Sequence, residues 1–493
     1  MNIFWGDLHN HCGITYGMGS LENALKVARN HLDFATVTPH AFWPDMPPRS
    51  KEIDYLIDFH ERGFAKIAED WESVKAGIDE ANEPGAFTSL FSFEMHSSRY
   101  GDHHFVSPDR ALAIAQFPTP RAVMDNCAAR AIAVPHHVGY TPGYRGIDWD
   151  SFDGRISPVV EVISKHGCAM HEKCGFPYYH DMGPLDPRNT VHRGLMAGRR
   201  FGFVGSTDHH AGFPGSFGDG KLAVLSEENT REAIFRALKA RRTYAVTGSR
   251  IRCGFEVNGE NFGGEIPSAG GYDLRFSAVA SNAIDRIVLY RDLTPIRVFD
   301  GWALPETGGR HKLRLELGWG DNADAPHPWD VHVKVENGRI LGAEQCLRGR
   351  SVLSPTQRVH GGDDINRCDW GIRERTDGEL RFFCETWRNN STLSPSTAQL
   401  VLEIEGGPDA RLVCEINGIV VDTTVGKLAD AGLSGHLKPY NSQAYKLHTA
   451  VPYGKYAFEG ELRVPDAGAG VFHMEVRQFD GDAAYVSPVF VNR

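Results

Sequence analysis

This chain of 493 residues lacks three features that would place it in other classes of protein. No apolar run approaches the roughly 20 residues that cross a membrane. No two of its nine cysteines have the C-x-x-C spacing, and acidic residues outnumber basic ones to give a formal net charge of −11. This charge argues against generic binding to nucleic acid or to an anionic membrane. It still allows an anionic small-molecule substrate, because a metal centre can invert the local field.

The first residues and the cysteines also indicate the cellular compartment of the protein. A histidine motif begins at Asp7, so we expect no cleavable signal sequence before it. An odd number of cysteines without such a signal indicates reduced thiols, which predicts a cytoplasmic protein. Cys168 and Cys174, which lie closest in sequence, fit no common metal or redox motif, and we interpret both as structural.

Histidine is present in quantity and is unevenly distributed. Sixteen of the 23 histidines lie within residues 1–250, where helical and strand-like patterns alternate. From Ser249 onward short strands separated by Gly, Asn and Asp turns dominate, which is typical of a β-sandwich. A chain of this length needs more than one core. We therefore predict an α/β domain over residues 1–248 and a sandwich-like all-β domain over residues 249–493, with an irregular insertion around residues 340–395.

The most informative segment lies at the start of the chain. The apolar run Ile3–Gly6 reads as a strand and leads into Asp7-Leu8-His9-Asn10-His11. Side chains two residues apart on an extended chain point the same way. Two neutral imidazoles presented together at a strand end are suitable ligands for a transition metal.

The same arrangement returns along the first half, where short apolar strands end in histidine or a carboxylate. Parallel α/β barrels gather such residues at one face. A single histidine is more often a core or surface residue than a ligand, but six strand-end clusters within 250 residues favour a metal site. Imidazole-rich sites with one or two carboxylates suit zinc, manganese or iron better than magnesium or calcium. The candidate ligands are His9, His11, His40, Glu94, His103 or His104, His136 or His137, Asp208 and His210.

At these positions the sequence resembles the PHP (polymerase and histidinol phosphatase) superfamily of metal-dependent hydrolases. The segments that carry the resemblance are Asp7–His11, Val37–His40, Phe93–Glu94, His103, Val134–His137 and Gly205–His210. Further segments resemble an uncharacterised branch of that superfamily, the DUF3604 proteins: Asn229–Phe235, Arg242–Gly248, Val257–Gly259 and Asp480–Val489. The ordered set of motifs is specific, whereas any one of them alone would be weak.

The resemblance implies a fold and a set of metal ligands. The fold is a distorted (β/α)7 TIM-like barrel with metal ions at the C-terminal ends of its strands. By position, one ion would be held by His9, His11, Glu94 and Asp208, and a second by Glu94, His103 and His137. Glu94 would then bridge two divalent ions. His137 is preferred to His136 because His137-Val138-Gly139 aligns with the His-Pro-Gly of the family, and His103 is preferred to His104.

The sequence departs from the family pattern at a third ion site, to which His40 and His210 would belong. The usual Thr-Asp-His is here Thr38-Pro39-His40. The early loop histidine that completes a three-metal site in some relatives is absent, since Tyr16 and Gly17 occupy that region. We therefore predict two ions, each zinc, manganese or iron, and leave a third open.

Because the family includes phosphoesterases, the resemblance predicts hydrolysis of a phosphate mono- or diester by a metal-activated hydroxide. Whichever of His40, His209 and His210 is not a ligand could protonate the leaving alkoxide. Asp7 is interpreted as orienting a ligand histidine.

Substrate contacts are expected from loops over the mouth of the barrel. Arg145 could pair with an anionic group in a bidentate manner, although a solvated loop arginine is equally consistent with the sequence. The full set of candidate contacts is Arg99, Tyr140, Tyr144, Arg145, Lys165 and His166. No nucleic-acid or membrane partner is expected, and a homo-oligomer is compatible with the sequence.

Two other functions are compatible with the same motifs. The metal centre could hydrolyse or cleave a non-phosphate substrate such as a carbohydrate derivative or an ester, since fold alone does not decide chemistry. The chain could also be a binding protein with a relic site, but nearly every expected ligand is present.

Overall fold

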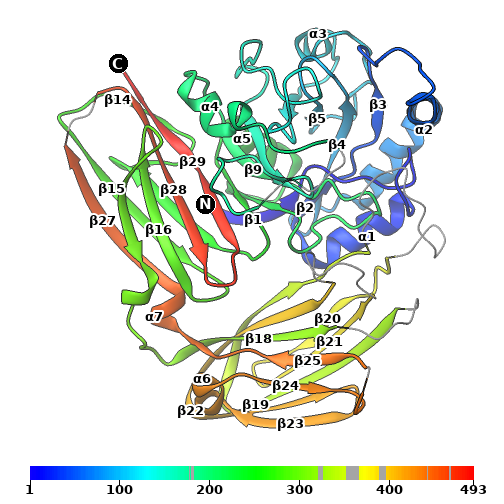
Figure 1. The fold of residues 1–493 in the computed structure, drawn as a ribbon. Coiled ribbons are helices and arrows are strands. Elements are labelled where there is room, and N and C mark those ends of the chain that lie inside the picture. Colours follow the sequence, from blue (N-terminus) through cyan, green and yellow to red (C-terminus); the bar gives the residue numbers. More distant parts are fainter. Residues whose placement is uncertain are drawn as a thin grey trace.

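The computed structural model describes residues 1–176, 178, 182–319, 326–350, 366–387, 396–440, 442–465 and 468–493. Three parts can be followed in Figure 1: an α/β unit of residues 2–246, a proximal β unit beside it and a distal β unit below. Each β unit has its own hydrophobic core, whereas several smaller apolar clusters surround the α/β unit. None of the described helices is both long and apolar enough to cross a membrane.

The α/β unit alternates short strands with helices. Its strands are β1 (Asn2–Asp7), β2 (Phe34–Thr36), β3 (His40–Phe42), β4 (Thr88–Met95), β5 (His103–Ser107), β6 (Ile132–Pro135), β7 (Val159–Ser164), β8 (Gly167–Cys168), β9 (Gly202–Gly205), β10 (Lys221–Ser226) and β11 (Thr243–Val246). Its helices are α1 (Leu21–His31), α2 (Asp54–Ala81), α3 (Pro120–Asp125), α4 (Val191–Met196) and α5 (Arg231–Lys239).

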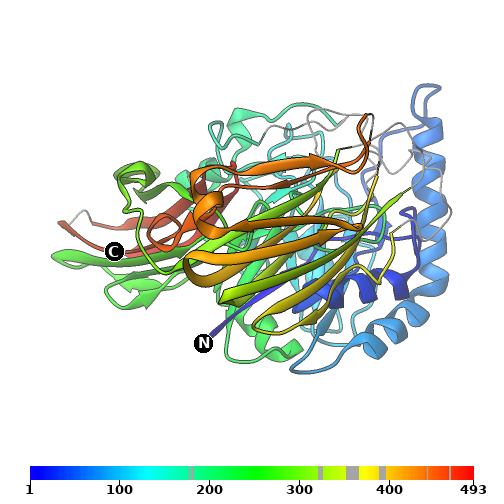
Figure 2. The same cartoon turned by 90° about the horizontal axis from the view of Figure 1, so that it is seen from below.

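The helix predicted over Leu21–His31 is confirmed, together with its cap. Ser20 Oγ accepts a hydrogen bond from the Asn23 backbone N–H at 3.2 Å, which satisfies one of the free donors at the start of α1. The long α2 lies at the outer edge of the molecule (Figure 2). Its apolar side chains, including Ile67 and Trp71, share a buried cluster with Phe91 and Phe93 of β4.

The strands of the α/β unit follow the order β6-β5-β4-β2-β1-β10-β11. β1, β2 and β4 are parallel, so their C-terminal ends meet at one edge. β5 and β6 continue in antiparallel fashion, and β7 and β9 form a separate parallel pair. The pairings of the described strands do not close a ring, although β6 contacts β7 and β9 contacts β11. The seven-unit barrel therefore stays a prediction.

The proximal β unit combines strands from two distant parts of the second half. They are β12 (Arg252–Val257), β13 (Glu260–Asn261), β14 (Glu265–Pro267), β15 (Gly271–Val279), β16 (Ile284–Arg291), β17 (Thr294–Asp300), β27 (Ala457–Pro465), β28 (Gly470–Gln478) and β29 (Ala483–Asn492). β29 pairs with β11 in register Tyr244↔Val486, so the sheet continues from the α/β unit into the proximal unit. Trp5 and Tyr244 belong to the proximal core for the same reason.

The distal β unit lies in sequence between the two parts of the proximal unit. It contains β18 (Arg310–Gly318), β19 (His327–Cys346), β20 (Gly371–Arg375), β21 (Glu379–Thr386), β22 (Ala398–Ile416), β23 (Ile419–Thr424), α6 (Val425–Asp430), β24 (Leu433–His436), β25 (Ala444–Leu447) and β26 (Val451–Pro452), followed by α7 (Tyr453–Tyr456). The long antiparallel β19 and β22 form its centre.

The second half thus forms two β units, whereas the sequence predicted one sandwich-like domain. The predicted irregular insertion around residues 340–395 holds the end of β19 together with β20 and β21, and its residues 351–365 and 388–395 lie outside the described part. Long-range pairing of β28 and β29 with the proximal sheet leaves no trace in local sequence patterns, so sequence alone could not separate the two units.

Candidate metal centre

The C-terminal ends of the parallel strands gather buried imidazoles and carboxylates. The segment after β1 runs parallel to the segment after β9, and the His11 backbone N–H donates to the His209 carbonyl at 2.9 Å. His40 begins β3 and lies opposite Glu94 of β4 in the parallel register. These backbone contacts place side chains that are far apart in sequence around one point, as the strand-end motifs predicted.

His9, His11 and Asp208 form one group of possible metal ligands. His11 Nε2 lies 3.0 Å from both His9 Nε2 and Asp208 Oδ1. His9 Nδ1 lies 3.0 Å from Glu161 Oε2, so this carboxylate accepts the Nδ1–H and leaves Nε2 as the lone-pair nitrogen facing the group. Glu161 therefore orients His9, a role that the sequence analysis assigned to Asp7.

Asp7 instead holds the surrounding backbone. It accepts hydrogen bonds from the Thr207 N–H at 3.1 Å, the Gly215 N–H at 2.9 Å and the His9 N–H at 3.1 Å. The Thr207 hydroxyl donates to it at 2.5 Å. Asp7 thus fixes the two segments that carry His9 and Asp208.

Glu94 lies at the middle of the centre. Its Oε2 is 3.5 Å from His9 Nε2, 3.4 Å from His11 Nε2 and 3.5 Å from His40 Nε2. Its Oε1 is 3.1 Å from His96 Nδ1 and 3.3 Å from His136 Nε2. The two oxygens therefore face different sets of imidazoles, which is the position that a carboxylate shared by two ions would take.

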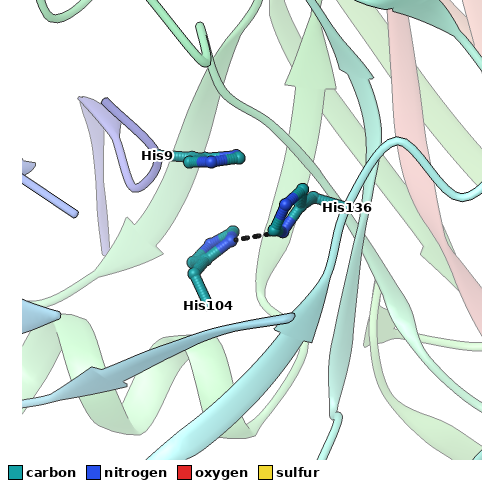
Figure 3. A group of neighbouring side chains, drawn as sticks. All are labelled: His9, His104 and His136. Carbon is teal, nitrogen blue, oxygen red and sulfur yellow. Dashed lines mark hydrogen bonds between the residues drawn. The ribbon is translucent and has the colours of Figure 1, made fainter. Parts of the chain in front are cut away.

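A second group consists of three histidines alone. Figure 3 shows the rings of His9, His104 and His136 around a common space, and these form a possible ligand set. His104 Nδ1 lies 3.2 Å from His136 Nδ1. His104 belongs to this group because β5 pairs it directly with Glu94, whereas His103 pairs with Met95. His103 points elsewhere, with its Nδ1 2.8 Å from the Gly101 carbonyl.

The strand pattern contains a signal for His104. Phe105 stacks on Phe93 at 5.0 Å in an apolar cluster. Because side chains alternate along a strand, His104 must then face the opposite side. His137, the other preferred residue of the sequence analysis, belongs to a further possible ligand group with Asp102 and His136, and its Nε2 lies 3.3 Å from Asp102 Oδ2.

A third group consists of His11, His40 and His210. The ring centroid of His40 lies 3.8 Å from those of both His11 and Tyr16. His209, the alternative to His210, turns away and contacts Phe213 with ring centroids 6.2 Å apart. Tyr16 thus packs against the third group in the region where the expected loop histidine is missing.

Sequence reasoning missed His96 and Asp102. Asp102 Oδ2 accepts from His96 Nδ1 at 2.9 Å and from Arg145 Nε at 2.7 Å, while Oδ1 accepts from the Ser97 N–H at 2.8 Å. His96 Nε2 in turn lies 2.8 Å from the Tyr16 hydroxyl, within hydrogen-bond distance. The result is a chain of hydrogen bonds from Asp102 through His96 to Tyr16. His96 lies only two residues after Glu94, which is the sole local hint of its role.

Burial and mutual charge set the protonation of these groups. Burial raises the pKa of Glu94, but His40, His96 and His136 outweigh this effect and hold the pKa well below its ordinary value. Asp208 follows the same pattern, with His9 and His166 as the principal opposing groups. Burial, aided by neighbouring imidazoles, holds the pKa of His40, His104, His136 and His210 well below the usual value. His9 is the exception, because burial lowers its pKa but Asp208 and Glu161 outweigh this effect and raise the pKa well above the usual value. Anionic carboxylates and the four neutral imidazoles are the forms that bind metal, and His9 would release a proton when it does so.

A cavity of about 770 Å³ opens onto the centre. Arg145 lies in its wall with the guanidinium carbon 5.2 Å from the Trp43 ring centroid. Tyr144 and His166 also line it, and Tyr140 supports His166 through a 2.8 Å contact between its hydroxyl and Nδ1. Arg99 is exposed and lies outside the cavity. Lys165 lies in the loop after β7, where its backbone N–H donates to the Thr207 carbonyl. The cavity therefore brings together three of the six predicted substrate contacts, with Tyr140 one layer behind.

Two donor atoms of the centre, Glu94 Oε2 and His104 Nε2, are buried and have no hydrogen-bond partner among the described residues. Leaving such polar atoms unpaired is costly, so a role as metal ligands accounts for them. Imidazole nitrogens with one or two carboxylates suit zinc, manganese or iron. The residues present therefore fit divalent transition metals.

Comparisons with known proteins reach only parts of the chain. A family described as a protein of unknown function (DUF3604) matches residues 216–265, from the loop before β10 to the start of β14. An uncharacterized protein of Chlamydia muridarum is 22% identical over 290 residues, covering 54% of this chain and 43% of the relative. One from Chlamydia pneumoniae is 24% identical over 316 residues, covering 60% of this chain and 47% of the relative. The chain thus spans less than half the length of these curated relatives.

One solved structure has a related description. It is a two-domain protein of Bacteroides vulgatus that contains a predicted PHP-like metal-dependent phosphoesterase. Its sequence is 14% identical, and the match covers 59% of this chain and 79% of that chain with a TM-score of 0.31. A similarity at this score says nothing about the activity of this chain, so the side chains of the centre have to carry the functional argument.

Proposed function

We propose that this protein is a metal-dependent hydrolase that cleaves a phosphate ester of a small molecule. The observation that supports this most is the position of Glu94, whose two carboxylate oxygens face different sets of buried imidazoles. His9, His11, Asp208 and Glu94 would hold one ion. Glu94, His104 and His136 would hold a second, and the group of His11, His40 and His210 offers a third position. Bound ions would act as Lewis acids on a phosphoryl oxygen and stabilise charge in the transition state.

We assign to Arg145 the role of binding the anionic group of the substrate. Its Nε donates to Asp102 at 2.7 Å, which fixes the guanidinium at the cavity wall. Nη2 also contacts Asp102 and His96, and Nη1 contacts Met182 Sδ, so the second N–H of Nη1 is the donor left for a phosphate oxygen. Arg145 also adopts a φ of +68°, an uncommon conformation for a residue other than glycine. Backbone strain of this kind is tolerated where the surrounding structure requires it.

We assign to Tyr16 the role of protonating the leaving group of the substrate. Tyr16 lines the cavity, and its hydroxyl lies 2.8 Å from His96 Nε2. Asp102 Oδ2 and Arg145 Nη2 both contact His96 Nδ1, at 2.9 Å and 2.5 Å, and so hold the imidazole in place beside Tyr16. This assignment replaces the histidines suggested by the sequence, because His40 packs within a ligand group and His209 faces Phe213.

A substrate panel tests the proposed function. Protein stripped with a chelator and reloaded with manganese or zinc would be assayed on phosphate monoesters, phosphate diesters, carboxylate esters and glycosides. We expect turnover of at least one phosphate ester and none after chelation. Cleavage of only carboxylate esters or glycosides would overturn the phosphoesterase assignment and favour the non-phosphate alternative.

A further inference from the structure

A second cluster of histidines lies outside the metal centre, where the α/β unit meets the proximal β unit. We call it the interface cluster. Its members come from the loop after β8, from α4, from β16 and from β28: His171, His192, Tyr290, His473 and Glu475. The sequence motifs that define the metal centre include none of these residues. Its chemistry therefore needs an explanation of its own.

The interface cluster contains buried nitrogens that no other group satisfies. His473 is fully buried, and neither of its ring nitrogens has a hydrogen-bond partner in the described part of the chain. The same holds for His192 Nε2 among the described residues. Leaving a buried polar group without a partner costs folding free energy. Three such nitrogens in one place indicate an unseen ligand.

The spacing of the imidazoles fits a metal ion. The ring centroids of His192 and His473 lie 5.5 Å apart, and those of His171 and His192 lie 4.9 Å apart. Two imidazoles on one tetrahedral zinc, each bound at about 2 Å, have ring centres about 5 Å apart. In the metal centre the ring centroids of His9 and His11 show the same spacing at 4.9 Å.

Glu475 supplies a carboxylate to the interface cluster. Its Oε1 lies 3.0 Å from His171 Nε2, and its Oε2 accepts from the Tyr290 hydroxyl at 3.3 Å. His171 Nδ1 accepts from the Lys173 N–H at 3.0 Å, so its proton is on Nε2 and is donated to Glu475. His171 and Tyr290 thus hold the carboxylate in place, as second partners of metal ligands commonly do.

We propose that the interface cluster is a separate metal site that binds one divalent ion of the zinc type. His192 and His473 would supply imidazole nitrogens, and Glu475 a carboxylate oxygen. Two imidazoles with one carboxylate are a known protein ligand set for zinc. Because His192 belongs to the α/β unit and His473 and Glu475 to the proximal β unit, the ion would join the two.

The direct test uses the wild-type protein. Crystals grown from protein loaded with zinc would be measured on both sides of the zinc absorption edge. We expect an anomalous peak between His192 and His473, apart from the peaks of the metal centre. A map with peaks at the metal centre and none at the interface cluster, with ordered water bridging the histidines instead, would overturn the proposal.

Variants give an independent count. Full-length His192→Ala and His473→Leu proteins would be loaded with zinc, desalted and analysed for metal per chain. Each should hold one ion fewer than the wild type, whereas His436→Ala, an exposed histidine of the distal unit, should hold the same number. Unchanged zinc content in folded His192→Ala protein would contradict the proposal. If a variant does not fold, the anomalous map of the wild type still decides.

This count does not depend on the phosphoesterase assignment. A protein that hydrolyses no phosphate ester but loses one zinc ion on His192→Ala would refute the proposed function and support the interface site. Phosphate-ester turnover combined with unchanged zinc content in that variant would support the proposed function and refute the interface site.

Discussion

The α/β unit and the distal β unit bury different kinds of side chain. At least twelve histidines of the α/β unit are buried, among them the ligand groups and the isolated His31. In the distal unit none of the five histidines that the structure describes is buried, and the core is built from apolar residues such as Leu400, Phe382 and Trp329. Even the indole N–H of Trp329 is satisfied, because it donates to Thr386 Oγ1 at 2.8 Å.

The core of the distal unit therefore consists of groups that stabilise the fold, whereas the α/β unit also buries groups suited to catalysis. Apolar burial contributes about 25 cal/mol per Å² to folding, whereas burial of unpaired polar groups costs free energy. The α/β unit retains buried polar atoms without partners, such as Glu94 Oε2, at the point where we place metal ions. The following predictions test whether this contrast is real.

The largest effect is expected from Asp208→Asn. The substitution removes the anionic oxygen 3.0 Å from His11 Nε2 and should lower kcat/KM for a phosphate ester on the order of 10³-fold, because a bound ion contributes several kcal/mol to the transition state. Phosphate-release kinetics would measure this. Asp422→Asn, an exposed carboxylate paired with Arg411 in the distal unit, is the matched control and should keep wild-type rates. Equal rates for both variants would show that Asp208 takes no part in the reaction.

Phe382→Ala tests the other side of the contrast. Phe382 is fully buried in the distal core, so its truncation should lower the free energy of unfolding of that unit by about 4 kcal/mol. Urea unfolding followed by fluorescence would show the distal transition at lower denaturant. Phosphate-ester turnover below the transition should remain, since Phe382 belongs to the distal core and not to the metal centre. A loss of turnover in folded protein would show that the units are not separate in function.

Much of the α/β unit could be predicted from the sequence because its signals are local. The Ser20 cap and apolar spacing gave α1, and short strands ending in His9, Glu94 and Asp208 marked the edge of the sheet. The choice between His103 and His104 depended on the pairing of β4 with β5, which is a tertiary fact. The role of Asp102 depended on Arg145, which is 43 residues away in sequence.

Asp102→Asn should have an intermediate effect. Loss of the carboxylate charge frees Arg145 and weakens the contact that holds the His96 ring in place, so kcat/KM should fall by about 10- to 100-fold. Steady-state kinetics with metal-saturated protein would measure this. Asp330→Asn, an exposed residue of the distal unit, should change nothing. An undiminished kcat/KM would show that the hydrogen bonds from Asp102 do not support the reaction.

The buried histidines also predict a dependence of stability on pH. Burial, with a contribution from Lys221, lowers the pKa of His31 from 6.5 to about 3, and its Nε2–H donates to the Pro214 carbonyl at 2.8 Å. Between pH 3 and 6.5 the unfolded chain binds a proton that the folded protein does not, so stability falls as the pH drops below 6.5. The slope per histidine is about 1.4 kcal/mol per pH unit.

His31→Gln isolates this effect. The amide can keep the hydrogen bond to the Pro214 carbonyl but does not titrate, so the variant should lose stability less steeply than the wild type between pH 6.5 and 5. Chemical denaturation of metal-free protein at several pH values would give the slopes. Identical slopes would mean that His31 becomes protonated without penalty.

The smallest effect is expected from His104→Leu in metal-free protein. The substitution replaces a buried imidazole whose Nε2 has no hydrogen-bond partner in the described structure, so the free energy of unfolding should rise by about 1 kcal/mol. Thermal unfolding with a chelator present would detect this. A stabilised variant that also binds less metal would show that His104 binds metal and lowers the free energy of unfolding of the metal-free protein. A clear destabilisation would show that His104 supports the fold.

We propose that the carboxylates and imidazoles around Glu94 bind metal ions and that the protein uses these ions to hydrolyse a phosphate ester. Chelator-stripped protein would be titrated with manganese or zinc while phosphate release is recorded from a substrate identified by the panel. We expect no release without metal, and an activity that rises with metal in wild-type protein but stays near background in Glu94→Gln protein. Phosphate release that is the same with and without metal, or equal in the two proteins, would contradict it.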